Sequence, residues 1–195
     1  MAASILRRGG IVAHPTETLY GLAVDPWRQA ALERLIEVKG RDARKGLILI
    51  ASGVDQAMAL LAPDCPELWR PLAEAFWPGP LTLVLPSGRR APKGVLGAAG
   101  GVAVRVTSDP AARALLEAAG MPLTSTSANR AGGPPERTAA GVAALFGPGL
   151  DLILDAGPRE GPAGSTIVDL LEGSPRLLRE GPISIRQIEA VLGRE

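Results

Sequence analysis

The sequence predicts an α/β fold, in which strands and helices follow one another along a single chain. Short apolar runs alternate with segments whose apolar residues recur at helical spacing, a pattern typical of this class. The 195 residues contain no internal repeat and nothing resembling an interdomain linker, so we expect one domain spanning 1–195. Hydrophobic residues make up 46% of the chain and aromatic residues only 3%, which predicts an aliphatic core.

Elements in the first half of the chain follow from these patterns. The run at 10–14 predicts a strand that stops at Pro15, and the continuous apolar run at 47–51 predicts a strand covered on both faces. Residues 28–39 have helical spacing, and Gly40 can end that helix. The same reasoning predicts the remaining elements of this half: helices at 54–61 and 67–76, and strands at 81–85 and 102–106.

Capping residues indicate where the helices of the second half begin. Asp109 and Pro110 start a helix at 109–119, Thr138 can cap one that runs to about 146, and Ser184 caps a terminal helix to about 192. Between them lie the remaining expected segments: a short strand at 122–125, a loop at 126–137, and strands at 151–155, 165–170 and 176–178. Strands mixed with helices at this spacing predict one α/β domain but leave the strand order open.

Composition limits where the protein acts and on what. The formal net charge is +1, so a nucleic-acid surface would have to be a local patch. No apolar run approaches the ~20 residues needed to span a bilayer, and residues 1–10 lack a signal-peptide pattern, so we expect no membrane partner. One cysteine, Cys65, excludes an internal disulfide and favours a reducing compartment. We therefore expect a cytoplasmic protein.

Several common catalytic motifs are missing from the sequence. There is no phosphate-binding G-x-x-x-x-G-K-[ST] loop and no G-x-G-x-x-G after a strand. His14 is the only histidine and ends an apolar strand, so a buried structural role is favoured over catalysis. Cys65 has no neighbouring histidine to activate it and is expected to be inert. An enzyme with this sequence would act by positioning and electrostatics.

The strongest chemical signal is a cluster of four cations within residues 39–45. The chain has only three lysines against 18 arginines, yet Lys39 and Lys45 flank Arg41 and Arg44 here. Lysine supplies a compact charge and arginine a planar fork, and a site for a polyphosphate can use both. Lys39 alone also suits the end of the preceding helix, where a cation is favourable. The other three lie beyond that end, so we predict phosphate binding.

Three further regions could contact a ligand. Residues 15–21 carry hydroxyls and a carboxylate just after a strand, although Thr16 or Thr18 could instead cap a helix. The segment 124–129 is rich in Ser, Thr and Asn and could equally form an ordinary turn. The third region consists of residues from separate strands: Arg105, Ser165, Thr166 and Arg179. Arg105 needs an anionic partner, which is either a ligand carboxylate or a protein Asp or Glu.

Together and in this order, these segments resemble the YrdC/TsaC family, the threonylcarbamoyl-adenylate synthases. The matching pieces span nearly the whole chain: PTETLYGLAVDP (15–26), KGRDARKGLILIA (39–51), WPGPLTLVLP (77–86), VAVRV (102–106), PLTSTSANRAGGPPERT (122–138), GSTIVDL (164–170) and LLREG (177–181). The resemblance implies a YrdC-like domain, with a twisted, largely mixed sheet flanked by helices around a concave, positively charged cleft. It also implies condensation of L-threonine, bicarbonate and ATP to threonylcarbamoyl-AMP, with release of pyrophosphate.

The resemblance assigns roles to individual positions. It implies catalytic or phosphate-binding roles for Lys39, Arg41 and Lys45, and L-threonine contacts for Thr18, Arg105, Ser127 and Ser165. It implies that Asn129, Arg137 and Arg179 help to bind ATP. Mg²⁺ is expected to arrive with the nucleotide, bound through phosphates and water, so no metal ligand set is predicted. The product would pass to a threonylcarbamoyl transferase complex that modifies position 37 of tRNA.

The sequence departs from the commoner family pattern at two positions. Asp42 follows Arg41 where many relatives have proline, and Ile50 lies near the place where some longer members have a threonine-contacting histidine. The chain resembles the short branch without an extra C-terminal domain. Two other functions remain open: a relative that handles carbamoyl-adenylate, and a module that binds double-stranded RNA or tRNA by charge.

Overall fold

The computed structural model describes residues 1–42, 45–162 and 164–193. Within them the strands form two mixed sheets, which confirms the predicted α/β class. The small sheet has the order β7-β2-β1-β8, with bounds Thr126–Ser127, Tyr20–Ala23, Val12–Pro15 and Leu152–Ile153. The large sheet has the order β10-β9-β4-β5-β3-β6, with bounds Arg176–Arg179, Thr166–Asp169, Leu81–Pro86, Gly101–Val106, Ile48–Ala51 and Leu123–Thr124.

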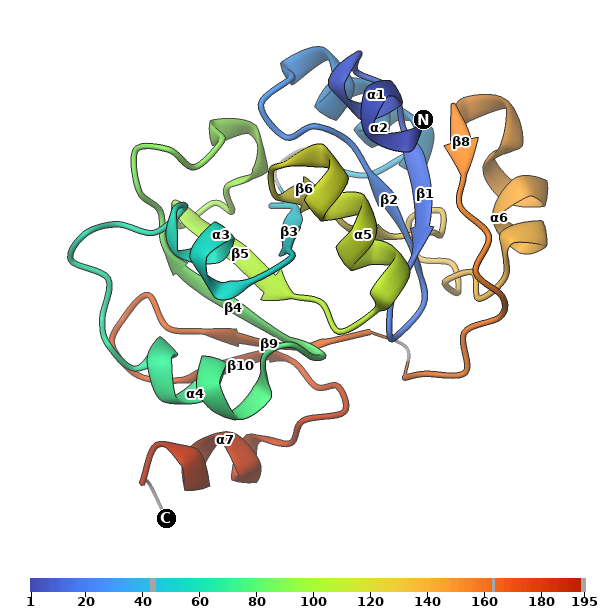
Figure 1. Cartoon of the computed structure of the whole chain (residues 1–195). Coiled ribbons are helices and arrows are strands. Elements are labelled where there is room, and N and C mark those ends of the chain that lie inside the picture. The colour runs from blue at the N-terminus through green and yellow to red at the C-terminus, as the bar shows by residue number, and fades with distance from the viewer. Residues whose placement is uncertain (43–44, 163, 194–195) are drawn as a thin grey trace.

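Helices cover these sheets and close the hydrophobic core (Figure 1). Their bounds are α1 Ala2–Arg7, α2 Gln29–Lys39, α3 Val54–Met58, α4 Trp69–Phe76, α5 Pro110–Ala119, α6 Ala139–Phe146 and α7 Ile185–Val191, with short 3₁₀ turns at Lys93–Val95 and Gly147–Gly149. Helices α1 and α5 pack together over apolar residues of β1, β2, β3 and β6. The buried residues are mainly aliphatic, as composition predicted. Among the described residues, no helix is both long and apolar enough to cross a membrane.

The predicted caps are confirmed, and they explain where the helices begin. The Asp109 carboxylate accepts the Ala112 N–H, and the Thr138 hydroxyl accepts the Gly141 N–H. Ser184 forms a reciprocal capping box with Gln187. At the end of α2, Gly40 adopts a left-handed conformation with φ of 62°, which a residue without a Cβ enters at little cost.

The hairpin of β1 and β2 corrects the prediction for residues 15–21. Pro15 is the last residue of β1, and β2 pairs with it antiparallel after a tight turn, so the helix-cap alternative for this segment is wrong. The Thr16 hydroxyl accepts the backbone N–H groups of Thr18 and Leu19 at 3.2 Å each, which fixes the turn. The sequence also gave no sign of α1, and it placed β7 in a loop.

His14 is fully buried in β1 and is held neutral by its surroundings. Nδ1 donates to the Pro15 carbonyl at 2.9 Å, and Nε2 has no hydrogen-bond partner among the described residues. Burial is the main reason that the pKa of His14 falls from its ordinary 6.5 to about 4. The buried structural role predicted from sequence is consistent with this environment.

A pH dependence of stability follows from this shift. Between pH 6.5 and about 4 the unfolded chain binds a proton at His14 while the folded chain does not, so stability falls as the pH falls through this window. We expect His14 to contribute roughly 2–3 kcal/mol of that loss. Urea unfolding at pH 7 and pH 4.5 checks this: His14→Gln should lose less stability than the wild type. An identical loss in both proteins would contradict it.

Candidate functional site

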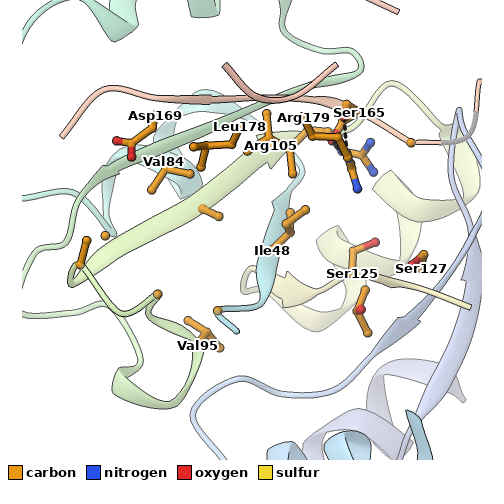
Figure 2. A pocket seen from close by; sticks show the side chains of 18 of the residues that line it. Ile48, Val84, Val95, Arg105, Ser125, Ser127, Ser165, Asp169, Leu178 and Arg179 are labelled. Carbon is orange, nitrogen blue, oxygen red and sulfur yellow. Dashed lines mark hydrogen bonds between the residues drawn. The ribbon is translucent and has the colours of Figure 1, made fainter. Parts of the chain in front are cut away.

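A cavity of about 370 Å³ lies on one face of the large sheet. Because side chains alternate along a strand, every second residue of neighbouring strands points into it. The floor is formed by such residues of β5, of β9 with the residue before it, and of β10: Gly101, Ala103, Arg105, Ser165, Ile167, Asp169, Arg176 and Leu178. Figure 2 shows several of these side chains converging from separate strands.

The opposite wall comes from distant parts of the sequence. The turn between β1 and β2 contributes Thr16, Thr18 and Leu19, and the segment around β7 contributes residues 125–127. Arg41, Gly46, Val95 and residues 97–99 complete the lining on this side. The three ligand regions expected from sequence therefore meet at one cavity with part of the cation cluster.

Two arginines define the polar end of the cavity (Figure 2). Arg179 donates from Nε to the Ser165 carbonyl at 2.9 Å and from Nη2 to the Ser165 hydroxyl at 3.0 Å. The Ser165 and Thr82 hydroxyls are hydrogen-bonded at 2.7 Å. Burial lowers the pKa of Arg179, and the positive charge of Arg105 lowers it further. Two guanidinium groups that repel each other provide a strong site for an anion.

Arg105 has a protein carboxylate as its partner. Its Nη1 lies 3.2 Å from Oε1 of Glu17, and only 6% of the Arg105 side chain is exposed. Burial lowers the pKa of Arg105, and the Glu17 charge opposes that shift. Arg105 also lines the cavity. Of the two partners that the sequence left open, the structure identifies a protein glutamate, while a ligand carboxylate could still reach the cavity side.

The other end of the cavity is mainly apolar, with the ion pair of Asp169 and Arg176. Val84, Leu171 and Leu178 line it, together with Asp169. Asp169 Oδ1 accepts the Leu171 N–H and Oδ2 accepts a bond from Arg176, both at 2.8 Å. Asp169 was not predicted as a site residue. Ser165, Ile167 and Asp169 are every second residue of the strand predicted at 165–170, and this alternation could have indicated that Asp169 faces the same side as Ser165. This end suits a flat heterocycle better than a charged group.

The fold separates the residues of the cation cluster, because among the residues that the structure describes Arg41 lines the cavity whereas Lys39 and Lys45 do not. Arg41 lines the cavity and donates from Nη2 to the Gly46 carbonyl at 2.8 Å. Burial lowers the pKa of Arg41, and Asp42 opposes that change. Lys45 is exposed and is not among the described residues that line the cavity. Arg44 lies outside the described residues.

Lys39 is buried behind the cavity wall, with 3% of its surface exposed. Its Nζ donates to the carbonyls of Ser127 and Asn129 and, at 3.2 Å, to Oδ1 of Asn129. Burial, and secondarily the charge of Arg41, lowers the pKa of Lys39 from 10.5 to about 8. The ammonium group therefore ties the end of α2 to the turn at 127–129.

Asn129 and Arg137 do not line the cavity in the described part of the chain. The Asn129 side chain accepts from the Ser127 hydroxyl at 2.6 Å and donates to the Gly133 carbonyl at 2.7 Å, which shapes the turn. Exposed Arg137 donates to the carbonyls of Arg159 and Gly161 at 3.0 and 2.6 Å. Both residues support neighbouring loops, and their predicted ATP contacts remain predictions.

No preformed cluster of metal ligands is found among the described residues. They contain no group of three or more His, Cys, Asp or Glu residues that could hold a metal ion. In the cavity lining, both oxygens of Asp169 already accept hydrogen bonds. The expectation that Mg²⁺ arrives on nucleotide phosphates stays a prediction, and no step proposed below depends on it.

The fold and the cavity define a mixed α/β protein whose cavity is lined by two arginines at one end and mainly by apolar side chains at the other. Residues 4–181 match the Sua5/YciO/YrdC family model, which carries the description "Telomere recombination". The chain belongs to this family.

Known relatives agree with this assignment. The chain is 39% identical over 193 residues to the threonylcarbamoyl-AMP synthase of Pyrococcus abyssi, covering 99% of this chain but 56% of that protein. It is 45% identical over 165 residues to the enzyme of the same name from Nitrosococcus oceani, covering 84% of this chain and 89% of the relative. The crystal structure of P. abyssi Sua5 complexed with L-threonine superposes with a TM-score of 0.92 at 40% identity, over 99% of this chain and 56% of that one.

Proposed function

We propose that this protein is an L-threonylcarbamoyladenylate synthase, which condenses L-threonine, bicarbonate and ATP into threonylcarbamoyl-AMP and releases pyrophosphate. The observation that carries this proposal is the cavity. It joins a hydroxyl-lined end containing Arg105 and Arg179 to an apolar end containing Asp169. The names of the two relatives and the L-threonine complex of P. abyssi Sua5 support the same reaction.

The amino acid would occupy the polar end. The Arg105 guanidinium suits the threonine carboxylate, and Thr18, Ser127 and Ser165 provide hydroxyl groups around the same space. The adenine ring would lie against Val84 and Leu178. The triphosphate would then extend toward Arg41 and Arg179, and exposed Lys45 would reach the same phosphates from outside the cavity lining.

The proposed chemistry needs no protein nucleophile. The threonine amine and bicarbonate combine to a carbamate with loss of water. A carbamate oxygen then attacks the α-phosphorus of ATP, and the bond to the β-phosphate oxygen breaks, so pyrophosphate leaves with the electron pair. The arginines would stabilise charge that develops on the transferring and leaving oxygens, which is how enzymes of phosphoryl-group chemistry gain most of their rate.

One assay tests the function directly. Pyrophosphate release from ATP should require both L-threonine and bicarbonate, and mass spectrometry should detect threonylcarbamoyl-AMP. A carbamoyl-adenylate-handling relative would instead release pyrophosphate with carbamoyl phosphate in the absence of threonine. A pure RNA-binding module would release none and would retain tRNA on a filter. Either of the last two outcomes would contradict the proposal.

The cation cluster provides a second test. We expect Arg41→Ala to lower pyrophosphate release by about 10- to 150-fold, because a charge-assisted contact to phosphate contributes about 1.5–3 kcal/mol. Lys45→Ala should act in the same direction with little change in melting temperature, since its side chain is exposed. Calorimetric measurement of ATP affinity checks both variants. Wild-type affinity and turnover in both variants would show that the cluster does not bind phosphate.

The product implies a place in tRNA modification. A mixed carbamic–phosphoric anhydride is an activated acyl donor, so we propose that a threonylcarbamoyl transferase complex consumes it to modify position 37 of tRNA. Direct contact of this chain with tRNA or double-stranded RNA, the organisation of 1–195 as one YrdC-like domain and a cytoplasmic location remain predictions from the sequence.

A further inference from the structure

Glu17 lies between two cavity residues but faces another direction. Within the described residues, Thr16 and Thr18 line the cavity and Glu17 does not. Its carboxylate is directed instead at the end of β5, where Oε2 accepts a 2.6 Å hydrogen bond from the Thr107 hydroxyl. Oε1 lies 3.2 Å from Nη1 of Arg105. One glutamate thus connects the turn between β1 and β2 to the arginine at the polar end.

Arg105 depends on this carboxylate. Side-chain exposure is 6% for Arg105 and 14% for Glu17, so both charges are largely removed from water. A buried cation without an anion is strongly unfavourable, and Arg179 adds a second positive charge nearby. Burial lowers the pKa of Arg105, and Glu17 is the partner that opposes the shift. In the described part of the chain, the ion pair that Arg105 forms is with Glu17.

The geometry also restricts how Arg105 can rotate. Oε1 of Glu17 forms the ion pair with Nη1 of Arg105, and the Thr107 hydroxyl donates a hydrogen bond to the other carboxylate oxygen, Oε2. Thr107 itself is fully buried, and its hydroxyl oxygen accepts the Asp109 N–H at 3.2 Å, so the chain of contacts ends on rigid backbone at the start of α5. The Glu17 carboxylate, itself fixed by Thr107, therefore favours the orientation in which the Arg105 guanidinium makes this ion pair while it lines the cavity.

We propose that Glu17 is a positioning residue for the amino-acid subsite. Supported by Thr107, it orients the Arg105 guanidinium for the carboxylate of the amino-acid substrate and does not itself touch substrate. This inference rests on the proposed function, because it assigns Arg105 to the L-threonine carboxylate. It predicts that Glu17 sets affinity for the amino acid and leaves ATP binding unaffected.

The test compares Glu17→Gln with the wild type. Glutamine has nearly the same shape and can still accept from Thr107, but it lacks the charge that holds Arg105. We expect the KM and the calorimetric Kd for L-threonine to rise at least 10-fold, with the KM for ATP unchanged within 2-fold and kcat within about 3-fold. Glu33→Gln on the exposed face of α2 is the matched control and should match the wild type.

Three outcomes decide the matter. A merely structural role of Glu17 would lower the melting temperature and impair both substrates alike, so an equal rise in KM for ATP and L-threonine would overturn the inference. Unchanged L-threonine affinity in an active variant would also overturn it. If Glu17→Gln does not fold, Thr107→Val, which removes the supporting hydroxyl, should raise the KM for L-threonine several-fold, and an unchanged KM would again overturn the inference. Failure of the wild type to bind L-threonine or release pyrophosphate would instead refute the proposed function.

Discussion

Replacing Arg179 with glutamine is expected to lower pyrophosphate release about 100-fold. Its guanidinium is fixed on Ser165 by two hydrogen bonds and lies at the polar end of the cavity. Charged groups held in place before the reaction stabilise developing charge without reorganisation, and one such contact contributes roughly 1.5–3 kcal/mol. Glutamine can keep part of the hydrogen bonding but none of the charge. Steady-state kinetics with saturating L-threonine and bicarbonate measures the effect.

The expected loss should come from catalysis rather than folding. Arg179→Gln should unfold within a few degrees of the wild type, because the position lies at the rim and buries little apolar surface. Arg186→Gln on the exposed side of α7 is the control for removal of one positive charge and should retain full activity. Comparable turnover in the two variants would show that Arg179 does not act on the reacting phosphate.

Replacing Lys39 with methionine is expected to destabilise the fold by about 2 kcal/mol. The buried ammonium donates to the carbonyls of Ser127 and Asn129; after its loss the Ser127 carbonyl still accepts the Asn129 N–H at 3.0 Å, whereas the Asn129 carbonyl loses its donor. Each unsatisfied buried group costs about 1–3 kcal/mol. For a chain of this size the change corresponds to a fall in Tm of roughly 4–8 °C. Thermal unfolding followed by circular dichroism at pH 7 measures it.

The scarcity of lysine makes a three-way comparison possible. Lys39→Met, Lys45→Met and Lys93→Met together remove each lysine of the chain in turn. Lys39→Met should lose stability, Lys45→Met should lose activity alone, and exposed Lys93→Met should resemble the wild type. Lys39→Met could instead have the same melting temperature as Lys93→Met and yet lose activity. The Lys39 ammonium would then act on substrate, as the family resemblance implied, and the anchoring role would be wrong.

Local signals predicted much of the fold. Asp109, Thr138 and Ser184 were expected to cap helices, and each does so through its side chain. Strand β2 was missed because four residues that include Gly21 carry little strand signal of their own. Its existence depends on pairing with β1 and β7, which sequence periodicity does not reveal. Strand order was open for the same reason.

The sequence identified many of the residues that line the cavity, but it could not show where each side chain points. Thr18, Arg41, Arg105, Ser127, Ser165 and Arg179 meet at the cavity as a set. Lys39 shares the charge of its neighbours but points from the end of α2 to a turn 88 residues away, a direction that spacing cannot indicate. Glu17 was seen as part of a motif, yet its pairing with Arg105 joins two sheets and required coordinates.

The order in which the cavity walls are synthesised has a consequence for the nascent protein. The wall begins at Thr16, whereas β9 and β10 finish the floor only between residues 166 and 179. Because β9 pairs with β4 and β10 then pairs with β9 as the edge strand, a chain still emerging from the ribosome lacks this part of the site until synthesis passes β10. A ligand of the complete cavity can therefore stabilise this protein only after synthesis has passed residue 179, and it offers no help to a shorter fragment.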